Sequence, residues 1–262
     1  MQRQEILALY DCELRLNAPL PGATFRYERT ATILRLIGPS AAAHDNCVVF
    51  SRLDAAGADA AIAGEIDYFA SLDHAFEWKL HGHDEPADLA ERLLRHGFAA
   101  EPPETIVVRD LADEPPRPPA TLSIEIRRIG EPSELSALVA LQDEVWGDDH
   151  TWYGQALARE LAADATQIEI LVACAQARPV ATSLMRLHRG TLFGSLWGAA
   201  TLPAFQRRGL YTALVERHVM TARAAGARLL TVDANDNSRP VLERVGFRSL
   251  VGVQGFVWRP PG

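Results

Sequence analysis

Apolar positions divide the first part of the chain into helical and strand segments. Residues 3–17 place apolar side chains three and four positions apart, which is the period of a helix with one buried face. Gly97 follows another such segment, where a helix end favours a left-handed residue. The pattern predicts a helix over 3–17, strands near 24–29, 32–37 and 46–52, a helix over 55–71, a strand over 76–80, a helix over 86–96 and a strand over 105–108.

The second part of the chain continues this mixture of helices and strands. Tight turns at 177–179 and 189–190 separate three apolar runs, so these runs should form an antiparallel meander. The pattern predicts a strand over 124–127, helices over 132–146 and 151–163, strands over 167–175, 179–188 and 192–202, a helix over 208–225, a strand over 229–233, a helix over 239–245, and a final strand or strand pair over 249–259. The fold class is therefore α+β, a mixed α/β arrangement.

A proline-rich stretch separates two domains. Four prolines in five positions favour polyproline II and exclude a helix interior or a central strand, so residues 113–121 should form a semi-rigid linker. The expected domains are 1–112 and 122–262. Strand, helix, Gly-Phe and strand recur in both, with Gly97-Phe98 matching Gly246-Phe247. This repeat favours a duplication, and chance similarity is the alternative.

Charge and composition narrow the function classes. The 262 residues carry a net charge of −8, which divides into −9 over residues 1–118 and +1 over residues 119–262. Lys79 is the single lysine, so a nucleic-acid partner is not expected. No apolar run reaches the length of a membrane span, and no signal peptide is evident, so no membrane association is expected. Three cysteines without paired spacing predict a reducing cytoplasm and no metal site.

The most informative segment is Thr201–Leu214, where a strand turns into a helix. The first amides of a helix have no intrahelical partner and lie at the positive end of the helix dipole, which suits a phosphate group. Gly209 allows close approach, Arg207 and Arg208 add positive charge, and no acidic residue lies between 170 and 215. The turn predicts a pyrophosphate-binding nest. It lacks the lysine of a nucleotide P-loop and is not a G-x-G-x-x-G turn.

These residues resemble the GNAT superfamily of N-acetyltransferases. The turn Gln206-x-x-Gly209-x-Tyr211, the later Asn235 and Gly246-Phe247 follow its pattern over about 124–262. The resemblance implies a mostly antiparallel mixed sheet flanked by helices, with the fourth and fifth strands splayed. The first half resembles a degenerate second copy that lacks the turn and should not bind the cofactor.

The resemblance implies acetyl-CoA as the acyl donor. Its pyrophosphate would lie on the amides of 207–212, and its pantetheine arm would pair with the strand edge near Ala199 to Leu202. An amine of an unknown small molecule or peptide would attack the thioester directly. The residues expected to bind the cofactor are Ala200, Thr201, Leu202, Gln206, Arg207, Arg208, Gly209, Leu210, Tyr211, Thr212, Asn235 and Ser238.

Two positions depart from the family pattern. Tyr211 stands where the family has glycine or alanine, and packing toward the sheet is the preferred interpretation. Leu242 stands where many members have a tyrosine that protonates the thiolate, so that acid cannot be carried over. Asn237 and Ser238 are expected to cap the helix that starts before Pro240.

Candidates for the catalytic base are less specific. Asp233 lies near the end of the fifth strand, and Glu144 lies near the expected substrate pocket; both are candidates, with solvated surface charges as the alternative. The other candidates near the pocket are Asp148, Asp149 and His150. The aromatic residues that either line the pocket or belong to the core are Trp146, Trp152, Tyr153 and Trp197.

Three functions remain open from the sequence. The first is an acetyl-CoA-dependent N-acetyltransferase, and a homodimer is compatible with it. The second is a non-catalytic acyl-CoA sensor, which the missing tyrosine at Leu242 motivates. The third is a structural or partner-binding protein in which both copies are degenerate. Binding of acetyl-CoA separates the first two from the third.

Overall fold

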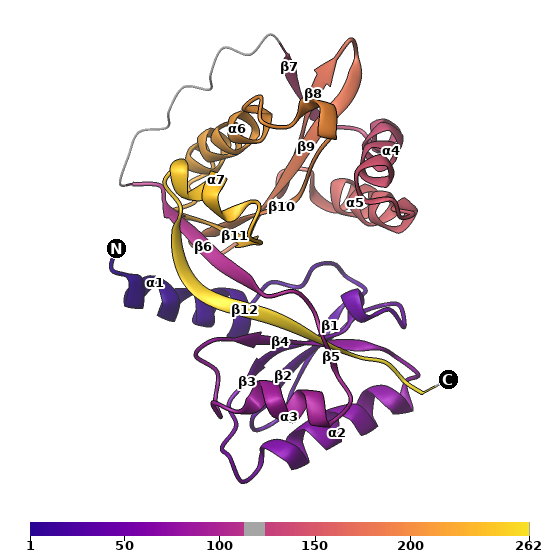
Figure 1. Ribbon diagram of the computed structural model, residues 1–262, viewed down its shortest axis with the longest axis vertical. Coiled ribbons are helices and arrows are strands. Elements are labelled where there is room, and N and C mark those ends of the chain that lie inside the picture. The colour runs from indigo at the N-terminus through magenta and orange to yellow at the C-terminus, as the bar shows by residue number, and fades with distance from the viewer. Residues whose placement is uncertain (113–123, 262) are drawn as a thin grey trace. The chain divides into compact units, whose positions relative to one another are not determined.

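The computed structural model describes residues 1–112 and 124–261, which fold into two compact units (Figure 1). The first unit consists of Met1–Ile106, Ala234–Asp236 and the end of the chain from Ser249. The second consists of Val107–Asp233 and Asn237–Arg248. The predicted linker 113–121 lies outside the described residues.

The units differ from the expected domains 1–112 and 122–262 at two places. The end of β6 (Glu104–Asp110), from Val107, belongs to the second unit, where β6 lies beside β11 (Leu229–Ala234). Most of β12 (Arg248–Trp258), from Ser249, belongs to the first unit, where it pairs with β4 (Phe76–His81). Each unit therefore completes its sheet with a strand from the other part of the chain.

The first unit has a sheet in the order β1-β2-β3-β4-β12, with β5 paired to β12. Its strands are antiparallel neighbours except β3 and β4, which are parallel. Its other elements are α1 (Arg3–Tyr10), which continues as a π-helical turn over Asp11–Leu16, β1 (Arg26–Arg29), β2 (Ile33–Ile37), β3 (Cys47–Ser51), α2 (Ala58–Ser71), α3 (Leu89–Arg95) and β5 (Ala99–Ala100).

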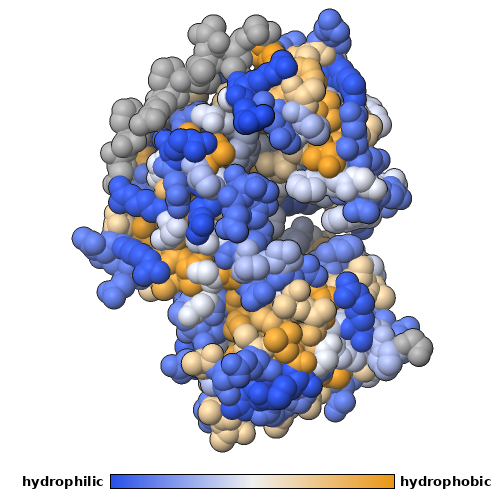
Figure 2. Space-filling model, viewed as in Figure 1, coloured by the Kyte–Doolittle hydropathy of each residue, from blue (hydrophilic) through white to orange (hydrophobic). Residues whose placement is uncertain are grey.

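Aromatic side chains dominate the core of the first unit. Phe69 of α2 stacks on Phe76 of β4 at 4.2 Å between ring centroids, and Trp78 is also fully buried. Leu89 and Leu93 bring α3 onto the same core. Figure 2 shows that hydrophilic residues cover most of the visible surface and that some hydrophobic residues are exposed over this unit.

The second unit has a sheet in the order β6-β11-β10-β9-β8-β7. Strands β8 to β10 form the predicted antiparallel meander, β7 extends it by pairing antiparallel with β8, and β10 and β11 are parallel. Its other elements are β7 (Glu125–Ile129), α4 (Leu135–Trp146), α5 (Thr151–Asp164), β8 (Ile168–Ala175), β9 (Arg178–Leu187), β10 (Phe193–Thr201), α6 (Leu210–Ala224) and α7 (Arg239–Arg244). The α+β class is thus confirmed.

Helices cover both faces of the second sheet. Leu138 of α4 and Leu157 of α5 pack on one face with Ile170 of β8. Leu214 of α6 packs with Leu171 of β8, whose side chain points to the opposite face. No helix in residues 1–112 or 124–261 has both the length and the apolar character needed to cross a membrane.

The parallel pair at the centre of this sheet opens into a V. The register pairs Phe193–Ser195 of β10 with Leu229–Thr231 of β11, and β10 then continues to Thr201. On the opposite edge of β10, where it pairs with β9, a bulge between Trp197 and Ala200 shifts the register of the pairing. The splayed fourth and fifth strands implied by the sequence are therefore present.

Candidate active site

A short turn connects β10 to α6. The Leu202 amide donates to the Val180 carbonyl oxygen at 2.9 Å, which fixes the end of β10 on β9. A 3-10 turn over Pro203–Phe205 follows, and the Gln206 side chain donates back to the Thr201 carbonyl at 3.3 Å. The turn is thus anchored at both of its ends before the helix begins.

Two residues of this turn adopt left-handed backbone conformations. Arg207 has φ +58° and Gly209 has φ +79°, directly before the first helical residue, Leu210. A non-glycine residue in this region costs roughly 1–2 kcal/mol. Such strain is characteristic of functional turns, and alternating left-handed residues turn successive amides toward one point.

The amides of residues 207–212 are the central feature of the site. In the described part of the chain, no protein atom accepts a hydrogen bond from them; the first helical bond runs from the Ala213 amide to the Gly209 carbonyl at 3.0 Å. Gly209 is exposed, and a Cβ added there would contact no atom within 4 Å. Open space therefore surrounds the Cα of Gly209, within the segment whose amides need acceptors.

Positive charge accompanies these amides. Arg207 and Arg208 are exposed, and Arg208 lies over the Phe205 ring with 4.9 Å from its guanidinium carbon to the ring centroid. Arginine is permanently charged and matches phosphate geometry. The predicted residues Gln206 to Thr212 thus lie together in one turn and the start of α6, beside Ala200, Thr201 and Leu202 at the end of β10.

The remaining predicted cofactor residues lie elsewhere or act differently. Tyr211 is half-buried on α6, and burial raises its pKa to about 12. Asn235 follows β11 and belongs to the first unit. Ser238 is the N-cap residue of α7 but makes no side-chain capping bond, so the cap predicted for Ser238 is wrong. Leu242 is fully buried and offers no acid.

Gly198, in the bulge of β10, is a feature that the sequence analysis missed. Its φ is +57°, and its carbonyl accepts from Gln142 Nε2 at 2.9 Å. A Cβ at this position would overlap the Tyr153 hydroxyl. The available signal was a glycine inside a strand, which indicates a bulge or a close contact.

The Tyr153 hydroxyl is buried and has no hydrogen-bond partner in the described structure. Burial raises its pKa to about 12, so the phenol keeps its proton at neutral pH. A buried hydroxyl without a partner costs roughly 1–3 kcal/mol, and in native proteins it needs an explanation. A ligand group at the bulge of β10 would supply the missing partner.

The two candidate bases occupy different surroundings. Asp233 is half-buried on β11, in the splayed segment beyond the pair Ser195–Thr231. Because side chains alternate along a strand, Asp233 shares the Thr231 face of the sheet, which is also the Ser195 face. Glu144 instead forms an ion pair with Arg178, and both side chains are at least half exposed. The geometry therefore supports Asp233 more than Glu144.

The surrounding acidic and aromatic candidates fall into two groups. The Asp149 side chain accepts from the Thr151 amide at 2.8 Å, and His150 contacts Asp143 at 3.2 Å, so both have structural bonds. Three of the aromatic candidates are exposed, contrary to the core alternative: Trp146, Trp152 and Trp197.

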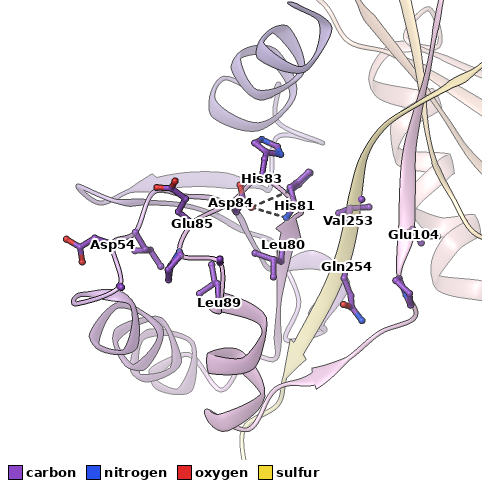
Figure 3. A pocket seen from close by; sticks show the side chains of 17 residues that line it. Asp54, Leu80, His81, His83, Asp84, Glu85, Leu89, Glu104, Val253 and Gln254 are labelled. Atoms are coloured by element: carbon purple, nitrogen blue, oxygen red, sulfur yellow. Dashed lines mark hydrogen bonds and ion pairs between the residues drawn. The ribbon is translucent and has the colours of Figure 1, made fainter. Parts of the chain in front are cut away.

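The first unit has a hollow of its own, at the ends of β3 and β4 (Figure 3). The cavity measures about 730 Å³, and its lining includes Leu80, Leu89 and Gln254. Asp54, which also lines it, accepts from the Gly57 amide at 2.7 Å through its carboxylate. This hollow therefore presents an acidic group where the second unit presents open amides.

The comparisons with known proteins agree with this geometry. Residues 134–247 match the Acetyltransferase (GNAT) family model. A GCN5-related N-acetyltransferase from Kribbella flavida is similar in structure, with TM-score 0.71 and 16% identity over 98% of this chain and 95% of that one. No curated protein matches the sequence.

Two further solved structures are similar. A tandem GNAT protein from the clavulanic acid biosynthesis pathway has TM-score 0.65 and 13% identity over 92% of this chain and 85% of that one. A GCN5-related N-acetyltransferase from Sphaerobacter thermophilus has TM-score 0.60 and 13% identity over 90% of this chain and 83% of that one. The chain thus has the fold of tandem GNAT proteins, and residues 134–247 are similar to the GNAT acetyltransferase family.

Proposed function

We propose that this protein is an acetyl-CoA-dependent N-acetyltransferase that acts on a primary amine. The observation that carries the proposal is the row of amides at 207–212 that lack protein acceptors beside two exposed arginines. A diphosphate supplies several acceptor oxygens and the negative charge that such a turn favours. The family supports acyl transfer, and the turn specifies a donor that carries phosphate.

The splayed strands provide a place for the pantetheine arm of the donor. A pantetheine arm is extended and carries amides, so it can pair with the free edge of β10 near Ala200 and Thr201. The acyl group would then lie near the bulge at Gly198, where β10 leaves its register with β9. Residues 1–106, the N-terminal part of the first unit, take no part in binding the donor in this proposal.

The chemistry follows from this placement. The amine nitrogen attacks the thioester carbonyl, an N–C bond forms, and the C–S bond breaks. Asp233 is the proposed acceptor of the amine proton, directly or through water. Solvent or the released proton protonates the thiolate, since Leu242 offers no acid. Positioning of donor and amine supplies much of the rate.

Acetyl-CoA binding tests the proposal most directly. We expect a micromolar Kd and one site per chain by titration calorimetry. Ligand at 100 times its Kd should add about 2.7 kcal/mol to the stability of the folded protein. Release of CoA thiol in the presence of an amine separates an enzyme from a protein that only binds acyl-CoA.

Gly209→Glu should abolish acetyl-CoA binding, with at least a 100-fold rise in Kd, because it places bulk and negative charge at the nest. Gly226→Glu is the matched control. Gly226 has φ +85° at the other end of the same helix, and a Cβ there also meets no atom within 4 Å. Both variants carry the same backbone strain, so an equal loss of binding in both would contradict the proposal.

The cellular location and the oligomeric state stay predictions. Cys12, Cys47 and Cys174 are unpaired, as expected in a reducing cytoplasm. A homodimer remains compatible with the proposed reaction, because the residues assigned to donor binding come from one chain.

A further inference from the structure

Three tryptophans of the second unit are exposed to solvent. Trp146, Trp152 and Trp197 are 56%, 47% and 42% exposed, whereas Trp78 and Trp258, in the first unit, are buried. They come from the end of α4, the start of α5 and the splayed part of β10. Exposed large apolar side chains that gather at one place mark a binding surface.

Contacts connect all three residues to the bulge at Gly198. The Trp146 Nε1 group donates to Gln142 Oε1 at 2.8 Å, and Gln142 is the residue that holds the Gly198 carbonyl. Trp152 lies edge-on to Tyr153 at 5.7 Å between centroids, and the Tyr153 hydroxyl lies against Gly198. Trp197 directly precedes Gly198. We name Trp146, Trp152 and Trp197 the tryptophan rim.

The charge around the rim is negative. The loop between Trp146 and Trp152 carries Asp148 and Asp149, both exposed. Arg186, whose guanidinium carbon lies 5.8 Å from the centroid of the Trp197 ring, is paired with Glu160 through two hydrogen bonds of 2.7 and 2.8 Å. An acidic loop beside aromatic faces attracts organic cations, because the ring faces and the carboxylates are both electronegative.

We infer that the acceptor is a protonated primary amine carried by a short alkyl chain on a flat aromatic group. The aromatic group stacks on the tryptophan rim, the acidic loop attracts the ammonium, and the amine loses its proton before it attacks the thioester beside Gly198. The acetyl group moves from sulfur to nitrogen and free CoA thiol is released. This inference rests on the proposed acetyltransferase function and names its substrate class.

A panel of matched amines tests the substrate class. We would measure CoA thiol release with acetyl-CoA and 2-phenylethylamine, 2-cyclohexylethylamine, n-butylamine, putrescine or a short peptide with a free N-terminus. Phenyl and cyclohexyl differ in flatness at similar size. We expect kcat/KM for 2-phenylethylamine to exceed that for each of the others at least 10-fold. Equal or better acetylation of n-butylamine, putrescine or the peptide would overturn the inference.

Variants of the tryptophan rim test whether these residues bind the aromatic amine. Trp152→Ala and Trp146→Ala should each raise the KM for 2-phenylethylamine at least 10-fold and leave the Kd of acetyl-CoA within twofold. Trp152→Phe should restore most of the affinity. Met220→Ala is the control, since Met220 is 40% exposed on α6 of the same unit. An unchanged KM in both alanine variants would also overturn the inference.

Separate results would contradict the proposed function and the proposed substrate class. If wild-type protein does not bind acetyl-CoA by calorimetry, the acetyltransferase proposal is wrong, and the substrate class is wrong with it. If acetyl-CoA binds and the rim variants do not affect the aromatic amine, only the substrate class is wrong.

Discussion

The two units place a parallel strand pair and its connecting helix in the same order, yet their turns differ. In the first unit the turn between β3 and α2 commits its amides: Gly57 donates to the Asp54 carboxylate and Ala58 to the Asp54 carbonyl. In the second unit the turn between β10 and α6 leaves the amides of 207–212 without protein acceptors. In the proposed function, one short turn and not the fold therefore determines which unit binds the donor.

The two turns also differ in the charge of their side chains. A carboxylate at Asp54 repels a phosphate at the position where Arg207 and Arg208 would attract one. Both units bury an ion pair. In the first unit the pair joins Arg15, in the helical segment after α1, to Asp84, in the loop after β4; their side chains are 2% and 4% exposed, with two hydrogen bonds of 2.8 Å between them. In the second unit the pair joins Arg109 to Glu216 at 2.9 Å, whereas Arg207 and Arg208 are exposed in the turn before α6.

The largest effect should come from Asp84→Asn. Burial alone would raise the pKa of Asp84. Hydrogen bonds from His81 and the charge of Arg15 lower this pKa by more than burial raises it, so the pKa of Asp84 lies below its ordinary value. Removing this carboxylate breaks the buried pair and leaves Asp11, which is more exposed, as the remaining carboxylate partner of Arg15. Breaking such a pair costs about 3–5 kcal/mol. Urea unfolding should show this loss.

The same variant tests the independence of the two units. Below its unfolding transition, Asp84→Asn should bind acetyl-CoA with a Kd within twofold of wild type. Glu85→Gln is the control, because Glu85 is the exposed neighbour of Asp84. A 10-fold loss of acetyl-CoA affinity in folded Asp84→Asn would show that the first unit contributes to the donor site.

A smaller effect should follow from acid at His188 in the second unit. Burial, and then the charge of Arg186, lower the pKa of His188 to about 4, and its Nε2 lies 2.8 Å from Ser195 Oγ. The unfolded chain binds a proton near pH 6.5, so this contribution to stability is complete above pH 6.5 and is lost as pH falls toward 4. The loss is about 1.4 kcal/mol per pH unit in that window.

Unfolding free energies measured by urea at pH 7 and pH 5 check this prediction. His188→Gln keeps a polar partner for Ser195 and removes the titration, so the pH dependence of its stability should be weaker than that of wild type by roughly 2 kcal/mol. An identical pH dependence in the two proteins would mean that His188 is not neutral in the folded state.

Local sequence patterns predicted most of the elements, because helix and strand periods are local properties. The meander, the helices and the turn at Gln206–Gly209 all appear where expected. The exchange of β6 and β12 between the units was not predicted, because the sequence of a strand does not specify which other strand it pairs with. The short strand β5 was missed for the same reason.

The candidate site also has features that local sequence predicts and features that depend on tertiary contacts. The nest could be predicted because its residues are consecutive in the chain. The connection of Gln142, Tyr153 and Gly198 brings together residues up to 56 positions apart, which spacing alone does not reveal. The exposure of the tryptophans is also a tertiary property, and the sequence left their role open between pocket and core.

The smallest predicted effect concerns single arginines in the two turns. Arg208→Gln should raise the Kd of acetyl-CoA about fivefold, because one exposed charge beside a diphosphate contributes little in water. The loss should shrink at high salt, since screening already weakens the wild-type contact. Arg52→Gln is the matched control: Arg52 also lies over a phenylalanine, Phe50, in the turn that follows β3. Calorimetry at 50 mM and 500 mM salt should show a salt-dependent loss for Arg208→Gln and none for Arg52→Gln. Equal losses in both variants would contradict a specific contact between Arg208 and the donor's phosphates.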